Sequence, residues 1–140
     1  TLFPYTTLFR SMVALAKNYL SQYGVDADRI VKAYPVSGQT TTHYAIRAER
    51  GISRDLPVID SLAPSNNVRK EGAPIMMITG DRELEMMARY EENAHLYALL
   101  RHFGHQTQLY ELQGCDHVSV LGPACYIIRE DIMRQRKAGL

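Results

Sequence analysis

A short apolar run, a long helical segment and a second β-prone run follow one another between residues 75 and 112, and this order constrains the fold most. Residues 75–78 (Ile-Met-Met-Ile) are continuously apolar, as a strand buried in a parallel sheet requires. The apolar stripe of residues 83–103 predicts a long helix that stops at Gly104, and residues 107–112 predict another strand. This alternation indicates an α/β layer protein with a parallel sheet.

The segments on either side extend the same pattern. Residues 12–23 repeat apolar side chains on one helical face and end before Gly24, and residues 30–36 are β-prone. Residues 43–72 predict a long excursion with little regular structure, and Pro123 opens a last helix. Three strands are few for such a sheet, so we expect further strands upstream. The apolar positions on one side of the last helix are Ala124, Ile128 and Ile132.

The first eleven residues carry a different signal. Residues 1–11 (TLFPYTTLFRS) resemble the translation of a common short-read sequencing adapter. We therefore interpret this segment as a translated adapter and exclude it from the fold. The interpretation predicts that residues 12–140 are an incomplete domain, the C-terminal portion of a larger one.

Composition excludes several classes of partner. Without Arg10, the 16 basic residues become 15 against 15 acidic ones, and a neutral chain with no basic cluster does not predict a nucleic-acid surface. No apolar run approaches the roughly 20 residues of a membrane span. Three histidines (His95, His102 and His105) lie near one helix end, but no zinc-like spacing follows them, so we expect no metal site. Nothing in the sequence implies a cofactor, and it leaves localisation and oligomeric state open.

Polar residues gather where the predicted strands end. Residues 37–43 follow the first strand, residues 79–83 the second and residues 114–117 the third. In open parallel sheets, reacting groups lie beyond the carboxyl ends of the strands. A carboxylate after one strand and a histidine after the next is also the acid-then-base order of a hydrolase triad.

The same stretches carry a family resemblance. From Met12 onward the chain resembles the C-terminal half of an α/β-hydrolase of the esterase and lipase-like carboxylesterase group. The resemblance implies a partial α/β-hydrolase fold in which helices flank the C-terminal part of a parallel sheet. The residues that carry it are 23–30 and 35–38 (the passage after the nucleophile elbow), 78–82 (the acid loop) and 114–117 (the histidine loop).

The resemblance also implies site residues. His117 takes the place of the general base. The acid is Asp81 or Glu83: the Gly-x-x-Asp pattern places it at Glu83, whereas Asp81 has the commoner side chain, and Glu85 ranks third. Thr40 lies in a sequence that can be mistaken for a nucleophile elbow, but its β-branched side chain suits the strained elbow backbone poorly.

We therefore expect the chain to be a fragment of a serine hydrolase that cleaves small-molecule carboxylic esters through a Ser-His-Asp/Glu triad. The resemblance places the nucleophilic serine and the oxyanion hole upstream, so we expect these 140 residues to be inactive on their own. The alternative is a non-catalytic, hydrolase-like binding scaffold, for which Glu83 in place of an aspartate and the threonine-rich loop leave room.

Overall fold

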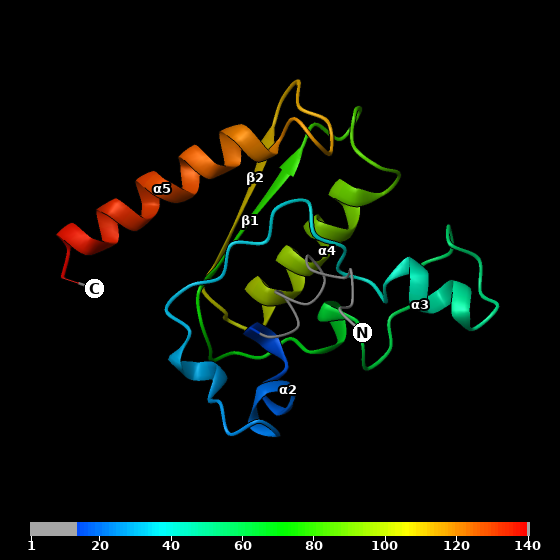
Figure 1. The fold of residues 1–140 in the computed structure, drawn as a ribbon, viewed down its shortest axis with the longest axis horizontal. Helices are drawn as coiled ribbons and strands as arrows, with labels where there is room; N and C mark the ends of the chain where they lie inside the picture. The colour runs from blue at the N-terminus through cyan, green and yellow to red at the C-terminus, as the bar shows by residue number, and fades with distance from the viewer. Residues whose placement is uncertain (1–13, 140) are drawn as a thin grey trace.

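A strand–helix–strand unit forms the centre of the molecule. The computed structural model describes residues 14–139, and in it β1 (Ile75–Gly80) pairs in parallel with β2 (Thr107–Leu112). Helix α4 (Arg89–His102) connects them, and Figure 1 shows it running beside the two strands. The expected fold class, a partial α/β fold with a parallel sheet flanked by helices, is confirmed.

The segment before the excursion lies along the other edge of β1. Isolated parallel bridges join Ala33 to Ile75 and Val36 to Ile78. The predicted strand at residues 30–36 is therefore present only as these two bridges. Pro35 has no N–H to donate, and its carbonyl accepts from the Ile78 N–H at 3.0 Å.

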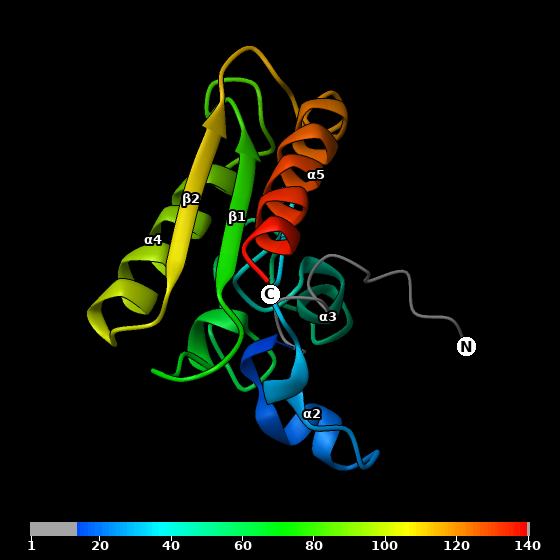
Figure 2. The same ribbon diagram turned by 90° about the vertical axis from the view of Figure 1, so that its left-hand side faces the viewer.

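Alternate residues of β1 build two hydrophobic clusters, one on each face of the sheet. Figure 2 shows α4 on one side of the strands and α5 (Leu121–Lys137) on the other. The buried cluster on the α4 side is Leu15, Ile75, Met77, Leu96 and Leu100. The buried cluster on the α5 side is Met76, Ile78, Val120 and Ala124. Burial on both faces explains why residues 75–78 are continuously apolar.

The remaining elements are short. The excursion at residues 43–72 has little regular structure, as predicted, apart from one helix and one 3₁₀ turn. These elements are α2 (Lys17–Ser21), η1 (Ala27–Arg29), α3 (Tyr44–Glu49) and η2 (Pro64–Asn66). The prediction of a helix over residues 12–23 is met only in part, by α2 and by a left-handed Gly24 with φ of 70° after it.

Helix α4 begins later than the sequence predicts. The predicted start was Glu83, but Ala88 adopts a left-handed conformation with φ of 60° and interrupts any helix there. Residues 81–88 therefore form a turn, and the acids in the first turn of α4 are Glu91 and Glu92. The predicted stop is confirmed, since Gly104 has φ of 76° just after the helix.

Helix α5 is bound to the sheet edge by a buried carboxylate. The Asp131 carboxylate accepts hydrogen bonds from Lys32 Nζ at 2.7 Å, from the Tyr34 hydroxyl at 2.8 Å and from Gln135 Nε2 at 2.6 Å. Side-chain exposure is 9% for Asp131 and 14% for Lys32. This contact joins two segments about a hundred residues apart in the sequence.

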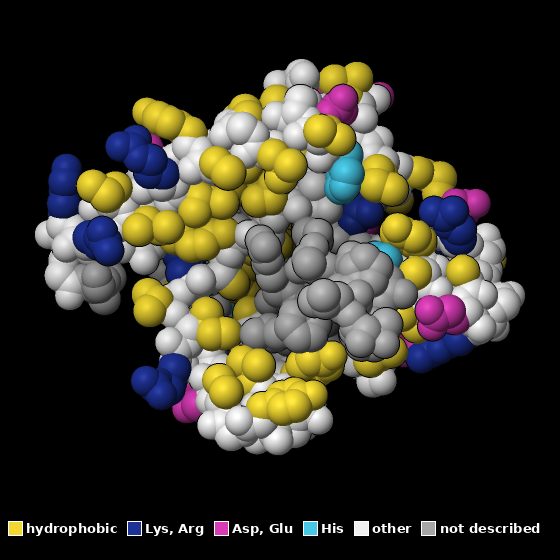
Figure 3. Space-filling view, viewed as in Figure 1, with side chains coloured by type: hydrophobic (Ala, Val, Ile, Leu, Met, Phe, Trp, Pro, Cys, Tyr) yellow, Lys and Arg dark blue, Asp and Glu magenta, His cyan; other side chains and the backbone are white. Residues whose placement is uncertain are grey.

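The outer side of α5 carries exposed apolar residues. The predicted stripe is only partly inward, because Ala124 is buried and Ile128 half-buried, whereas Ile132 is 40% exposed. Figure 3 shows apolar side chains gathered along this helix, and the exposed large ones on α5 are Leu121, Tyr126, Ile132 and Met133.

The adapter interpretation of residues 1–11 lies outside the described residues. Over residues 14–139, no helix combines the length and apolar character that a membrane span needs.

Candidate functional site

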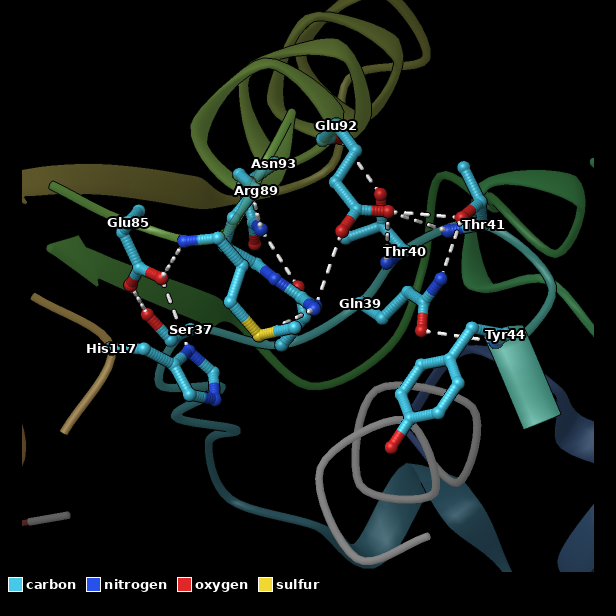
Figure 4. A network of polar contacts seen from close by, with 12 residues as sticks. Ser37, Gln39, Thr40, Thr41, Tyr44, Glu85, Arg89, Glu92, Asn93 and His117 are labelled. Carbon is cyan, nitrogen blue, oxygen red and sulfur yellow. Dashed lines mark hydrogen bonds and ion pairs between the residues drawn. The ribbon is translucent and has the colours of Figure 1, made fainter. Parts of the chain in front are cut away.

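Three loops meet beyond the carboxyl ends of the strands. They follow the segment at residues 33–36, β1 and β2, and each contributes one side chain to a polar network. Figure 4 shows Ser37, Glu85 and His117 together at one end of this network. The predicted gathering of polar groups at this edge therefore exists, although its carboxylate is Glu85.

Glu85 is held from several directions. One carboxylate oxygen, Oε2, lies 3.1 Å from His117 Nδ1 and accepts from the Met86 N–H at 3.1 Å. The other, Oε1, accepts from the Ser37 hydroxyl and from the Gly80 N–H at 3.1 Å. The Glu85 side chain is fully buried, whereas the His117 side chain is 43% exposed. A fixed carboxylate on one ring nitrogen selects the tautomer with the proton on Nδ1 and leaves Nε2 with a free lone pair.

Asp81 lies in the same turn and makes other contacts. Its Oδ2 accepts from the Gly114 N–H at 2.9 Å, and its Oδ1 accepts from the Glu83 N–H at 3.0 Å. Its own N–H donates to the Cys115 carbonyl at 2.8 Å. Asp81 therefore links the turn after β1 to the loop after β2, while the Glu83 side chain is exposed.

The two loops also touch through their backbones. A Cβ built on Gly80 would lie 2.4 Å from the Cys115 carbonyl oxygen, closer than any side chain can approach. Glycine is therefore required at this position by space. The close approach fixes the distance between the turn that carries Glu85 and the loop that carries His117.

Ser37 has a strained backbone. Its φ of 45° is in the left-handed region, which is uncommon for a residue other than glycine, and its N–H donates to the Ile78 carbonyl at 2.7 Å. The Ser37 hydroxyl donates to Glu85, so the carboxylate stands between the serine and His117. In a hydrolase triad the histidine occupies the middle position, so this order makes Ser37 a support for the carboxylate.

The histidine loop is shaped by its own aspartate. The Asp116 carboxylate accepts from the Ser119 N–H at 2.8 Å, from the Ser119 hydroxyl at 2.8 Å and from the Val118 N–H at 2.9 Å. The backbone and side-chain hydrogen bonds from Ser119 lower the pKa of Asp116. Asp116 thus stabilises the turn that presents His117.

Glu92 anchors the threonine-rich loop. Its Oε2 accepts from the Thr40 N–H at 3.1 Å, the Thr41 N–H at 3.2 Å and the Thr41 hydroxyl at 3.0 Å. Its Oε1 pairs with Arg89 Nη1 at 3.1 Å. Burial raises the pKa of Glu92, and the Arg89 charge opposes this effect. The Thr40 hydroxyl donates to the Glu92 carbonyl at 2.8 Å, so a structural contact occupies it.

One of the histidines considered for a metal site, His105, contacts the backbone instead. Within residues 14–139, no three His, Cys, Asp or Glu side chains are grouped so that they could hold a metal ion. The ring nitrogens of His105 lie 2.8 Å from the Arg69 carbonyl oxygen and 2.9 Å from that of Ala73. This buried histidine therefore joins segments of the backbone.

The carboxylate that contacts His117, Glu85, is the third-ranked of the three acids in the sequence prediction. Asp81, Glu83 and Glu85 all stand within five residues after β1, and only the path of the turn decides which one faces His117. The support from Ser37 was also missed, because the serine is 48 residues away from Glu85 along the chain. A single sequence contains no signal for either contact.

Comparisons with known proteins bear on the fold alone. No protein-family model and no curated protein matches the chain. Among solved structures, the chain is similar to the esterase 2 of Thermogutta terrifontis phosphoramylated by tabun, with a TM-score of 0.65 and 9% identity over 89% of this chain and 49% of that one. The butyrate-bound form of the same thermophilic planctomycete esterase gives a TM-score of 0.65 at 8% identity, covering 91% of this chain and 52% of that one.

A third similar structure comes from another source. It is a truncated carbohydrate esterase from gut microbiota, with a TM-score of 0.56 and 16% identity over 87% of this chain and 50% of that one. The chain thus spans about half the length of the esterases whose fold it shares.

Proposed function

We propose that this chain is part of a carboxylic ester hydrolase and supplies its general base, His117, and the carboxylate that orients this base, Glu85. The observation that carries the proposal is the buried Glu85 carboxylate, 3.1 Å from His117 Nδ1 and held by Ser37 and two backbone N–H groups. The fold likeness to esterases supports the reaction class. Small-molecule esters are the proposed substrates.

The proposed mechanism follows from this geometry. Glu85 keeps the proton of the imidazole on Nδ1, so that Nε2 can take the proton of an attacking serine hydroxyl. The imidazolium that forms is stabilised by the Glu85 charge, and its Nε2 proton passes to the leaving alcohol. Asp81, one of the two acids that the sequence left open, serves in this proposal to join the two loops, and the other, Glu83, has no catalytic role.

The nucleophile and the oxyanion hole are proposed to come from chain upstream of these residues. In support, the hydroxyls of Ser37 and Thr40 already donate to Glu85 and to the Glu92 carbonyl. The 140-residue chain should then show no ester cleavage that depends on His117. If this chain cleaved a short-chain nitrophenyl ester and His117→Ala abolished the cleavage, the proposal that the nucleophile lies upstream would be refuted.

The role of Glu85 is tested by the tautomer of His117. The chain is labelled with ¹⁵N-histidine and studied at a pH high enough that the imidazole rings are neutral. Long-range ¹H–¹⁵N spectra should then show His117 protonated mainly on Nδ1. Glu85→Gln should lower that population, because an amide can also donate to Nδ1. The matched control, Glu83→Gln, should leave it unchanged. An Nδ1 population insensitive to Glu85 would contradict the proposal.

Activity is tested on a longer polypeptide that includes the upstream serine. There, removal of the orienting carboxylate should lower kcat by on the order of 10⁴, the cost of a wrongly held imidazole. If the tautomer responds to Glu85 but no upstream serine exists, the non-catalytic scaffold becomes the better account.

A further inference from the structure

A cavity of about 280 Å³ lies between the turn after β1, the start of α4 and the loop around α3. It contains more basic than acidic side chains, together with the apolar surfaces of two methionines and a tyrosine. The lining residues are Gln39, Tyr44, Arg47, Arg54, Asp55, Met86, Met87 and Arg89. Figure 4 shows Gln39 and Tyr44 on the side of the network away from His117, and Arg89 between them and the His117 end.

Two of the lining arginines are buried, and each has an Nε donor without a hydrogen-bond partner among the described residues. Arg47 is 4% exposed and Arg89 is 7% exposed. Arg89 Nη2 donates to the weakly accepting sulfur of Met86, at 3.8 Å, and Arg47 Nη1 donates to the Leu56 carbonyl. Burying two guanidinium charges is costly, and an anion in the cavity that contacts these groups would offset part of this cost.

The charge around the cavity is unbalanced. Three guanidinium groups line it, against the Asp55 carboxylate and the adjacent Glu92, which pairs with Arg89. The effect reaches His43 nearby, where burial first and then the charges of Arg89 and Arg47 lower the pKa. One negative charge brought into the cavity would balance these groups.

The size and the apolar lining indicate the kind of anion. The volume of about 280 Å³ lies just below the roughly 300 to 1,000 Å³ typical of ligand pockets, so only a small group fits. Tyr44, Met86 and Met87 provide apolar surface beside the arginines, which suits a carboxylate on a short carbon chain better than an inorganic ion. Arg54, stacked over the Tyr44 ring at 4.7 Å, holds a further guanidinium at the exposed side.

We propose that this cavity binds the carboxylate of a small organic acid through Arg47, Arg54 and Arg89. Its lining residue Met86 directly follows Glu85 and donates its N–H to that carboxylate, so the cavity adjoins the candidate site. The next step rests on the proposed function. If that function holds, the ester cleaved at His117 carries a free carboxylate on its acyl or its alcohol part.

The test is a binding titration that requires no catalysis. The ¹⁵N-labelled 140-residue chain is titrated with succinate, with its neutral analogue succinamide and with inorganic phosphate, and amide shifts are followed around the cavity. We expect saturable shifts with succinate alone. Arg54→Gln, an exposed position, should weaken binding several-fold, and Arg89→Lys, which keeps the charge but loses the planar fork, on the order of tenfold. The matched control Arg129→Gln, exposed on α5, should bind like the unchanged chain.

Equal shifts with succinamide, tighter binding of phosphate than of succinate, or binding unaffected by Arg54→Gln would each overturn the proposal. Because Arg54 is exposed, its replacement can be compared even if the Arg89 variant unfolds. The outcome is separate from that of the proposed function, which depends on the His117 tautomer and on ester cleavage. Succinate binding without esterase activity would leave the anion site standing alone.

Discussion

Removal of the Asp131 carboxylate should destabilise the protein more than removal of any exposed acid. Asp131 joins α5 to Lys32 and Tyr34, and its side chain is only 9% exposed. The variant Asp131→Ala takes away the acceptor of four side-chain hydrogen bonds, including a long one of 3.4 Å from the exposed Arg134. It also leaves the Lys32 ammonium, 14% exposed, without its counter-ion.

The magnitude follows from the degree of burial. Breaking a buried ion pair costs about 3 to 5 kcal/mol, whereas exposed pairs contribute about 0 to 1 kcal/mol. Both partners keep some contact with solvent, so we expect Asp131→Ala to lower the free energy of unfolding by about 3 kcal/mol, the lower end of the buried range. The matched control Glu130→Ala, on the exposed side of the same helix, should change it by less than about 0.5 kcal/mol.

The assay is urea unfolding of the 140-residue chain and its variants, followed by circular dichroism. A double-mutant cycle with Lys32→Met isolates the ion pair. In that background Asp131→Ala should cost only about 1 to 2 kcal/mol, because the hydrogen bonds to Tyr34 and Gln135 are then the main loss. A cost below about 1 kcal/mol for Asp131→Ala alone, or one unchanged by Lys32→Met, would refute the reasoning.

The same contact predicts a pH dependence. Burial by itself would raise the pKa of Asp131, but hydrogen bonds from Lys32 and Tyr34 and the Lys32 charge lower it below its ordinary value. A folded-state pKa below the unfolded value of about 3.9 means that the stabilisation is fully present above that pH. It is lost as the pH falls further through the folded-state pKa. Asp131→Ala should therefore flatten the acid limb of the stability curve.

Two further predictions concern the loops around His117. Gly80→Ala should lower the free energy of unfolding by about 3 kcal/mol, because its methyl group would collide with the Cys115 carbonyl oxygen. Gly122→Ala in α5, with open space around it, should raise the free energy of unfolding by about 0.5 to 1 kcal/mol. Thermal unfolding compares the two variants. Asp81→Ala should cost about 1 to 3 kcal/mol in urea unfolding, since it removes the acceptor of two backbone N–H groups, and Glu83→Ala, at an exposed position, should be close to neutral. Equal effects of the paired variants would contradict either prediction.

The sheet could be predicted because its residues carry the signal themselves. Ile75 to Ile78 are apolar at every position since helices cover both faces, and Gly104 marks the end of α4 through its left-handed backbone. The segment at residues 30–36 was harder to predict. Its β-prone composition is real, but Pro35 reduces its pairing to two bridges.

The start of α4 and the carboxylate that contacts His117 could not be predicted for a common reason. Ala88 is a strong helix former, yet it adopts a left-handed conformation in which no side chain caps the helix. The turn before it is held by tertiary contacts, among them Glu85 with the Gly80 N–H and Ser37. The contact with Ser37 joins residues 48 apart in the chain, so local preference gives the wrong helix boundary and does not indicate which carboxylate contacts His117.

The backbone contact at Gly80 makes the position of the histidine loop independent of which side chain in the turn contacts His117. Because main-chain atoms set the spacing of the two loops, the histidine keeps its place whichever side chain of the turn reaches it. If the proposed function holds, the orienting acid can therefore occupy position 81, 83 or 85 in different relatives while the general base keeps the position of His117. In alignments of this fold, the column of the acid should then vary in register, while the glycine in front of it is held constant by geometry.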